Sequence, residues 1–273
     1  MKNRKILILI KCILTLMVIA IAFSYRTSIG IALAAICLAY LLFSIRAGIF
    51  RFIGSIQYSK KDFEKAVIWF KRAYENGKSK PRSAIQYAYL LLKSGNIDES
   101  ERIFKSLIDS QLQTDDLMFA RSNLALVLWK KGDLDGAVNM LEDIFSSFKT
   151  STIYGSLGYL LILEGDMQKA LKFNLEAYEY NSKNPVILDN LGQTYYLAGD
   201  YEKAVEIYKK LMSLNPTFPE AYFNYGLVLV KKGEAKDALL NMQKALNYKL
   251  SFLSTITREE IESKIEETGK MLD

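Results

Sequence analysis

The sequence predicts an all-α protein in which a solenoid of helix pairs, closed by a capping helix, follows two transmembrane helices. Two observations carry most of this prediction: a short motif recurs at intervals of 33 to 37 residues, and two long apolar runs open the chain. In addition, half of the residues are hydrophobic and only four are proline, which is typical of an ordered chain that permits helices.

The chain begins with two apolar runs, at residues 6–25 and 27–45. The only charged residue within them is Lys11, which lies near the start of the first run and can extend its ammonium group to the lipid headgroups. A helix rises about 1.5 Å per residue, so about 20 residues cross a hydrocarbon core of about 30 Å. The short connection at Arg26 permits only a tight turn. We therefore expect a membrane hairpin over residues 1–46.

Basic residues are concentrated beside this hairpin. The chain has 36 basic and 30 acidic residues, but residues 1–61 contain nine basic and no acidic residues. The rest of the chain thus has 27 basic and 30 acidic residues, a net charge of −3. Because a nucleic-acid-binding domain needs a basic surface, we expect the lipid bilayer, and no nucleic acid, as the partner of the basic segment.

The positions of lysine and arginine predict the orientation of the hairpin. Basic residues flank the outer ends of both apolar runs, at Lys2, Arg4, Lys5, Arg46, Arg51, Lys60 and Lys61. Only Arg26 lies between the runs, so the positive-inside rule places both termini in the cytoplasm, and we expect an integral protein of the plasma membrane. The alternative is a cleaved signal peptide ending near residues 20–22, which would leave the remaining chain on the same side.

The repeated motif is represented by residues 199–204, Gly-Asp-Tyr-Glu-Lys-Ala. Its copies end in a small residue at positions 66, 100, 137, 170, 204 and 238, so the spacings are 34, 37, 33, 34 and 34 residues. Such a period predicts stacked helix–turn–helix units. The glycine can end one helix in a left-handed turn, and the Asp or Asn after it suits the N-cap of the next. We expect six helix pairs over residues 47–250.

Around these motifs the chain resembles the tetratricopeptide repeat family, whose pattern has Leu-Gly and Tyr before the small residue and an aromatic residue after it. The fifth repeat matches through Leu191-Gly192, Tyr195, Ala204 and Tyr208. The main departures are Ala88 and Ser100 in the second repeat and Asn174 in the fourth. The resemblance covers about three quarters of the chain and implies a solenoid of the tetratricopeptide type.

Residues 251–273 predict a C-terminal capping helix. Thr257 and Glu260 have the spacing of a capping box, and Ile261, Thr268 and Leu272 recur on one helical face. This helix is expected to cover the last repeat. The alternative is that it folds back into the groove as an autoinhibitory segment.

The resemblance also implies that the first helix of each pair lines a concave groove that receives a partner. The aliphatic and aromatic candidates for this groove are Ile85, Tyr89, Leu92, Phe119, Leu126, Trp129, Tyr159, Ile162, Tyr196, Phe223 and Leu227. Asp189 and Glu220 fall on the same face. Such a groove suits an apolar or amphipathic protein segment. The competing interpretation is that several of these side chains pack between adjacent repeats.

Little in the sequence indicates catalysis. The chain has no histidine, which removes the usual general base and the commonest transition-metal ligand. Its two cysteines, Cys12 and Cys37, lie within the apolar runs. We therefore predict no catalytic, cofactor or metal site and a non-enzymatic scaffold or adaptor that binds proteins at the cytoplasmic face of a membrane. The alternatives are a regulatory receptor that senses a peptide, or an accessory subunit of a membrane-bound enzyme or of a secretion or envelope assembly complex.

A reporter fused after Asp273 tests the predicted orientation. We expect a reporter that functions only in the cytoplasm to be active there, and protease added outside intact cells to leave the repeats uncut. Activity of a reporter that functions only outside the cytoplasm would contradict the orientation.

Overall fold

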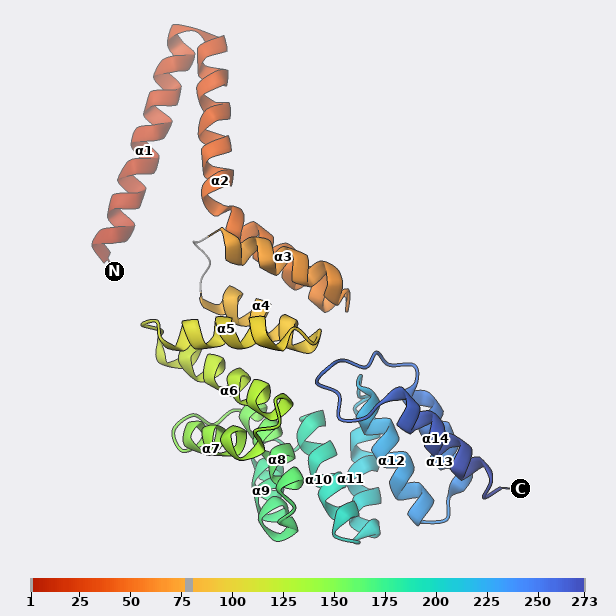
Figure 1. Ribbon diagram of the computed structural model, residues 1–273. Helices are drawn as coiled ribbons and strands as arrows, with labels where there is room; N and C mark the ends of the chain where they lie inside the picture. The colour runs from red at the N-terminus through yellow and green to blue at the C-terminus, as the bar shows by residue number, and fades with distance from the viewer. Residues whose placement is uncertain (1, 77–80, 273) are drawn as a thin grey trace. The chain divides into compact units, whose positions relative to one another are not determined.

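The computed structural model describes residues 2–76 and 81–272, with side chains from residue 13 onward. Every regular element in these ranges is an α-helix, and no strand occurs among them, which confirms the all-α class (Figure 1). The helices are α1 (Lys2–Tyr25), α2 (Thr27–Ser59), α3 (Phe63–Glu75), α4 (Pro81–Lys93), α5 (Ile97–Ile108), α6 (Thr114–Lys130), α7 (Leu134–Phe145), α8 (Ser151–Glu164), α9 (Met167–Tyr180), α10 (Pro185–Leu197), α11 (Tyr201–Ser213), α12 (Pro219–Lys231), α13 (Ala235–Ala245) and α14 (Arg258–Gly269).

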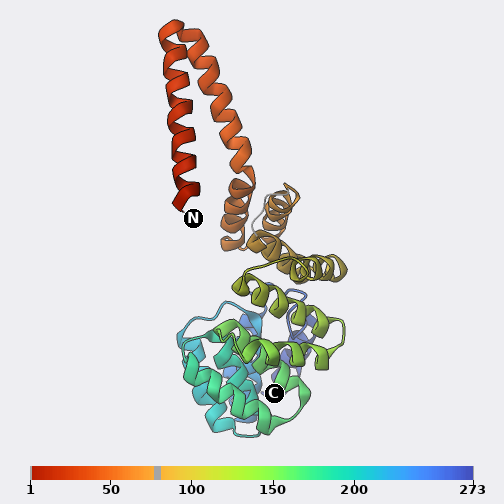
Figure 2. The ribbon, with the colours of Figure 1, turned by 90° about the vertical axis from the view of Figure 1, so that its left-hand side faces the viewer.

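The chain divides into two compact units, residues 1–83 and 84–273. In the first unit, α1 and α2 lie side by side and are joined at Arg26 (Figure 2). Helix α2 is continuous from the second apolar run into the first helix of the first repeat. Within the part of the chain that the structure describes, α2 is the one helix whose length and composition would allow it to cross a membrane. The described apolar part of α1, Ile13–Tyr25, is shorter.

The turns between paired helices adopt the left-handed conformation that the recurring glycine predicts. Five turn glycines have φ between +77° and +91°, namely Gly95, Gly132, Gly165, Gly199 and Gly233, and Lys61 takes this place in the first repeat at φ +60°. After Gly95, Gly132, Gly199 and Gly233, the next residue donates its N–H to a carbonyl five residues earlier, as from Asp200 to Tyr195 at 2.9 Å. This bond closes the end of the first helix in the manner of a Schellman motif.

The acidic residue after each turn then begins the second helix. The side chains of Asp62, Asp133, Asp166 and Asp200 each accept a hydrogen bond from an N–H group in the first turn of the helix that follows. Asn96 and Glu234 make no such bond, and the Asn96 amide donates to Ser94 instead. In these repeats a left-handed residue thus ends the first helix and an Asp begins the second, and together they produce a tight turn.

The two helices of a repeat approach each other closely at a fixed offset of 16 residues. A Cβ atom on Gly192 would lie 2.6 Å from the ring of Tyr208, and one on Gly226 would lie 2.7 Å from Met242. The small residues that end the motif, from Ala66 to Ala238, are all fully buried. Because no side chain fits between the helices at these points, the residue pattern determines how each pair packs.

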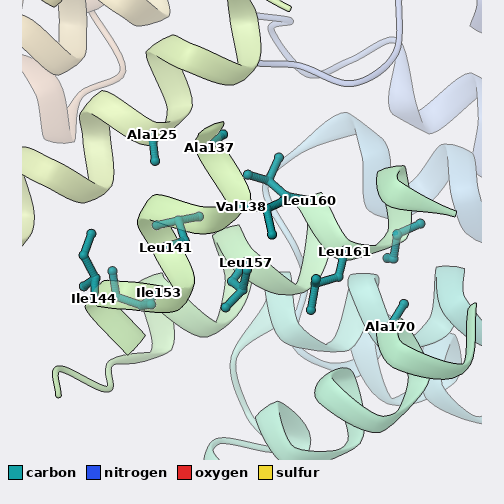
Figure 3. Close-up of a cluster of buried hydrophobic side chains, with 11 residues drawn as sticks. Ala125, Ala137, Val138, Leu141, Ile144, Ile153, Leu157, Leu160, Leu161 and Ala170 are labelled. Carbon is teal, nitrogen blue, oxygen red and sulfur yellow. The ribbon is translucent and has the colours of Figure 1, made fainter. Parts of the chain in front are cut away.

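Apolar side chains from successive repeats form the core of the second unit. In the cluster of Figure 3, Leu141 and Ile144 of α7 meet Ile153 and Leu157 of α8, and all four are buried. Helix α8 also packs against α10, and α10 against α12, so the first helices of successive repeats are neighbours. Burying such side chains stabilises the fold by about 1.5–3 kcal/mol each, and in this cluster part of the burial is between α7 of one repeat and α8 of the next.

Helix α14 covers the end of the last repeat. The capping box is present: Thr257 accepts from the N–H of Glu260 at 3.1 Å, and Glu260 accepts from the N–H of Thr257 at 2.6 Å. Ile261 and Thr268 are buried, with Ile261 in a cluster with Met242 of α13. Leu272 lies beyond the helix end and is exposed, so its predicted place on the buried face was wrong.

Replacing Ala204 by Arg tests the close approach of helices. Ala204 is fully buried where α11 meets α10, so an unpaired guanidinium there should lower the free energy of unfolding by about 3–5 kcal/mol. The neighbouring Lys203 is exposed and pairs with Asp200 on the surface, so Lys203→Gln should change it by less than about 0.5 kcal/mol. Circular-dichroism melts of the full chain in detergent measure both, and equal melting temperatures would show that the repeat register is misassigned.

Candidate partner-binding surface

The candidate surface is formed by the first helices of the repeats in the second unit, α4, α6, α8, α10 and α12. Four of the residues predicted to line a groove are buried: Ile85, Leu92, Ile162 and Phe223. In this conformation those four side chains pack inside the repeats, as the competing interpretation expects. The other seven are half-buried, namely Tyr89, Phe119, Leu126, Trp129, Tyr159, Tyr196 and Leu227. Their part in binding stays a prediction.

Trp129 and Tyr159 come from neighbouring repeats and meet on this surface. Their rings form an edge-to-face pair with centroids 5.5 Å apart and an interplanar angle of 71°. The ammonium group of Lys130 lies 4.2 Å from the Trp129 ring centroid. Burial lowers the pKa of Lys130, and the nearby Glu220 carboxylate opposes that shift. The surface therefore combines aromatic faces with a partly desolvated cation.

The segment that joins α13 to α14 runs across this surface, and we call its residues 249–256 the strap. Its tip is a turn in which Ser254 donates its N–H to the Ser251 carbonyl at 2.9 Å. The N–H of Phe252 donates to the Lys93 carbonyl at the end of α4, at 3.1 Å. The Phe252 ring lies beside Gly95, with a ring carbon 3.6 Å from where a Cβ would stand.

The strap also contacts α6, α8 and α12, the contact with α8 being a hydrogen bond between Thr255 and Tyr159. Lys130 donates from Nζ to the Ser254 carbonyl at 3.4 Å, and its ammonium lies 5.2 Å from the Phe252 ring centroid. The N–H of Thr255 donates to Oε1 of Glu220 at 3.2 Å. The strap thus touches the second, third, fourth and sixth repeats.

Asp189 lies buried in α10 beneath the same face. Its carboxylate accepts hydrogen bonds from the Tyr208 hydroxyl at 3.0 Å and from the Asn224 amide at 3.2 Å. Burial raises its pKa to about 7, helped by the Glu220 charge and opposed by these two hydrogen bonds. Burial also raises the pKa of Tyr159 to about 12, and a hydrogen bond with Thr255 opposes that rise.

The three asparagines that could bind the backbone of a partner use their amide N–H groups within the chain. Asn123 donates to the Phe119 carbonyl at 2.7 Å, Asn190 to the Gly155 carbonyl at 2.8 Å, and Asn224 to Asp189. Because these amide groups already form hydrogen bonds within the chain, they give little support to the alternative of a receptor that binds a peptide backbone through asparagine side chains.

The described residues contain no group of three or more His, Cys, Asp or Glu side chains that could hold a metal ion. The surface offers aromatic faces, the Lys130 cation and a few hydrogen-bonding groups. The sequence analysis did not predict the strap. The only signals for it were the small hydroxyl residues Ser251 and Ser254, which favour a turn but do not say where it docks.

Two families of repeat profiles match the chain: "Tetratricopeptide repeat" over residues 122–185 and "TPR repeat" over residues 192–233. A comparison with curated protein sequences found no match. Among solved structures, a tetratricopeptide repeat protein from Parabacteroides merdae is similar, with 13% identity, 93% of this chain and 98% of that chain covered, and a TM-score of 0.64.

Two further solved structures share the fold. One is a chain of the APC/C hetero-tetramer Cut9-Hcn1, with 15% identity, a TM-score of 0.65, and 84% of this chain and 45% of that chain covered. The other is pilF of Pseudomonas aeruginosa, with 12% identity, a TM-score of 0.56, and 82% of this chain and 99% of that chain covered. These low identities establish the solenoid fold alone.

The buried carboxyl group of Asp189 predicts a pH dependence of stability. Its pKa is about 7 in the folded chain and about 3.9 in an unfolded one, so between these values the folded state holds more protons. Raising the pH through this window therefore removes stability, on the order of 4 kcal/mol in full. No histidine contributes, because the chain has none.

We expect Asp189→Asn to flatten this dependence, because the amide stays neutral and its oxygen can still accept from Tyr208. Melts of the full chain in detergent at pH 5 to 8 should show a falling melting temperature for the wild type and a nearly constant one for the variant. Asp135→Asn, at an exposed position of α7, serves as the control and should leave the slope unchanged. An unchanged slope in Asp189→Asn would contradict the assignment.

Proposed function

This chain is a tetratricopeptide repeat protein, and from that premise we propose that it is a non-enzymatic adaptor that binds a segment of a partner protein on the first helices of its repeats. The observation that carries the proposal is the edge-to-face pair of Trp129 and Tyr159, which stays half-buried on that surface. Large aromatic side chains at the centre of an interface commonly supply about 2 kcal/mol or more each.

The adaptor is proposed to be anchored in a membrane by the apolar part of α1 and α2, with the repeats in the cytoplasm. Support comes from the length and apolar character of α2 and from the basic residues that flank the apolar runs. Because α2 continues without a break from the apolar run into the first repeat, the solenoid would begin at the lipid headgroups. Arg46 and Arg51 would then lie near anionic lipid.

A role as an accessory subunit of a membrane-bound enzyme or assembly complex is the second candidate. One structure with this fold comes from a hetero-tetramer, Cut9-Hcn1, in which a similar chain is assembled with other proteins. In either case the chain contributes binding, and the same surface would be used.

Trp129→Glu and Tyr159→Glu test the surface. After crosslinking in membranes, we expect each variant of the tagged chain to capture at least about tenfold less partner, since loss of about 1.4 kcal/mol weakens binding tenfold. The melting temperature should fall by only a few degrees, because both side chains are half-buried and pack partly against the core cluster of α7 and α8. Leu240→Glu is the matched control, because Leu240 is an exposed apolar residue on α13, outside the surface, with 64% of its area accessible.

Two outcomes would contradict the proposal. Capture that survives both aromatic substitutions would move the binding surface elsewhere. A large fall in melting temperature together with lost capture would assign Trp129 and Tyr159 to the core of the repeats.

A further inference from the structure

The strap is a stretch of polypeptide held on the very surface to which the adaptor function is assigned. We infer that the surface between Gly95, Lys130 and Glu220 is a docking site for an extended segment of a partner protein that carries an aromatic side chain within an uncharged, hydroxyl-rich sequence. The strap occupies this site until such a segment replaces it. This inference rests on the proposed function and specifies its ligand.

The contacts of the strap define what the site recognises. Two of them involve backbone groups of the strap alone: the N–H of Phe252 reaches the Lys93 carbonyl, and the carbonyl of Ser254 accepts from Lys130. A third joins the N–H of Thr255 to the Glu220 carboxylate. Any sequence can supply such backbone groups, so these three contacts favour an extended segment without specifying its side chains.

Side-chain selectivity comes from the aromatic position. The Phe252 ring lies against Gly95, with a ring carbon at ordinary contact distance, 3.6 Å, from where a Cβ would stand, and the Lys130 ammonium is 5.2 Å from the ring centroid. A cation near an aromatic ring favours Phe, Tyr or Trp over an aliphatic residue. Around Phe252 the strap is uncharged from Leu250 to Ile256 and has three hydroxyl residues, Ser251, Ser254 and Thr255.

The contacts that the strap makes with the site are few enough for a partner segment to displace it. Phe252 keeps 39% of its area accessible and Thr255 is also exposed, whereas Ile256, at the end of the strap, packs against the cluster that contains Met242 and Ile261 and belongs to the anchored end. Both ends are anchored independently: Tyr248 stacks on Tyr222 with centroids 5.2 Å apart, and the capping box at Thr257 holds the start of α14. The strap can therefore move while α13 and α14 remain packed.

A fluorescein-labelled synthetic peptide with the sequence of residues 248–257 is the probe, and the full chain in detergent is the target. The double variant Phe252→Ala, Thr255→Pro removes the aromatic ring and the N–H group that donates to Glu220. The strap of this variant should therefore no longer occupy the site. If the strap occupies the site in about nine-tenths of the molecules, only about one-tenth can bind the peptide, and the apparent affinity of the wild type for the peptide falls about tenfold. The peptide should therefore bind the double variant about tenfold more tightly than the wild type, as measured by fluorescence anisotropy.

Two controls accompany this titration. Adding Lys130→Met, which keeps the aliphatic stem and removes the donor, should abolish the gain in affinity. Leu240→Ala, on the exposed face of α13, should bind the peptide as the wild type does. Equal peptide affinity for the wild type and the double variant, or no binding to either, would overturn the inference.

Hydrogen exchange of the unmodified chain gives a second test that needs no variant to fold. Saturating peptide should speed exchange of the Phe252 and Thr255 amides and leave Glu260, bonded to Thr257, unchanged. Unchanged strap amides at saturation would overturn the inference. If the peptide does not bind but capture of the partner by the wild type still depends on Trp129, the docking inference is wrong and the proposed adaptor function is retained. If the peptide binds but capture does not depend on Trp129, the proposed adaptor function is wrong.

Discussion

The close approach of the two helices in each repeat is the constraint on which the rest of the fold depends. Gly192 and Gly226 face Tyr208 and Met242 at distances that exclude even a methyl group. Since each pair packs in the same way, neighbouring pairs stack in the same way, and α8, α10 and α12 become neighbours. One surface of aromatic and polar side chains then follows from the repeat itself.

Much of this architecture can be predicted from the sequence, because the repeated positions obey local rules. A left-handed turn favours glycine, a helix start favours Asp, and a helix crossing requires a small residue, so Gly199, Asp200 and Ala204 indicate their own roles. Positions that depart from the repeat pattern are harder to predict. Asn174 replaces an aromatic residue, yet it donates to the Gly158 carbonyl and to Thr194 at 3.2 and 3.1 Å, a compensation that spans two repeats.

The candidate site is less predictable, because helical periodicity identifies a face and not the depth of each side chain. Ile85 and Ile162 share the face of Trp129, yet both are buried. Asp189 looks like a surface carboxylate in the sequence, and its pKa of about 7 arises only from burial beside Glu220. The strap could not be predicted at all, since two of its contacts, Phe252 with Lys93 and Ser254 with Lys130, join residues more than 100 positions apart.

The central claim is that partners bind the first helices of the repeats, and site-specific photo-crosslinking in intact cells tests it most directly. A photoreactive amino acid would be placed at Leu126 or Tyr196 on these helices, and at Leu240 or Lys209 on exposed positions of the second helices. The account predicts one shared crosslinked partner from Leu126 and Tyr196 and none from Leu240 or Lys209. The same partner captured only from the second helices would contradict it.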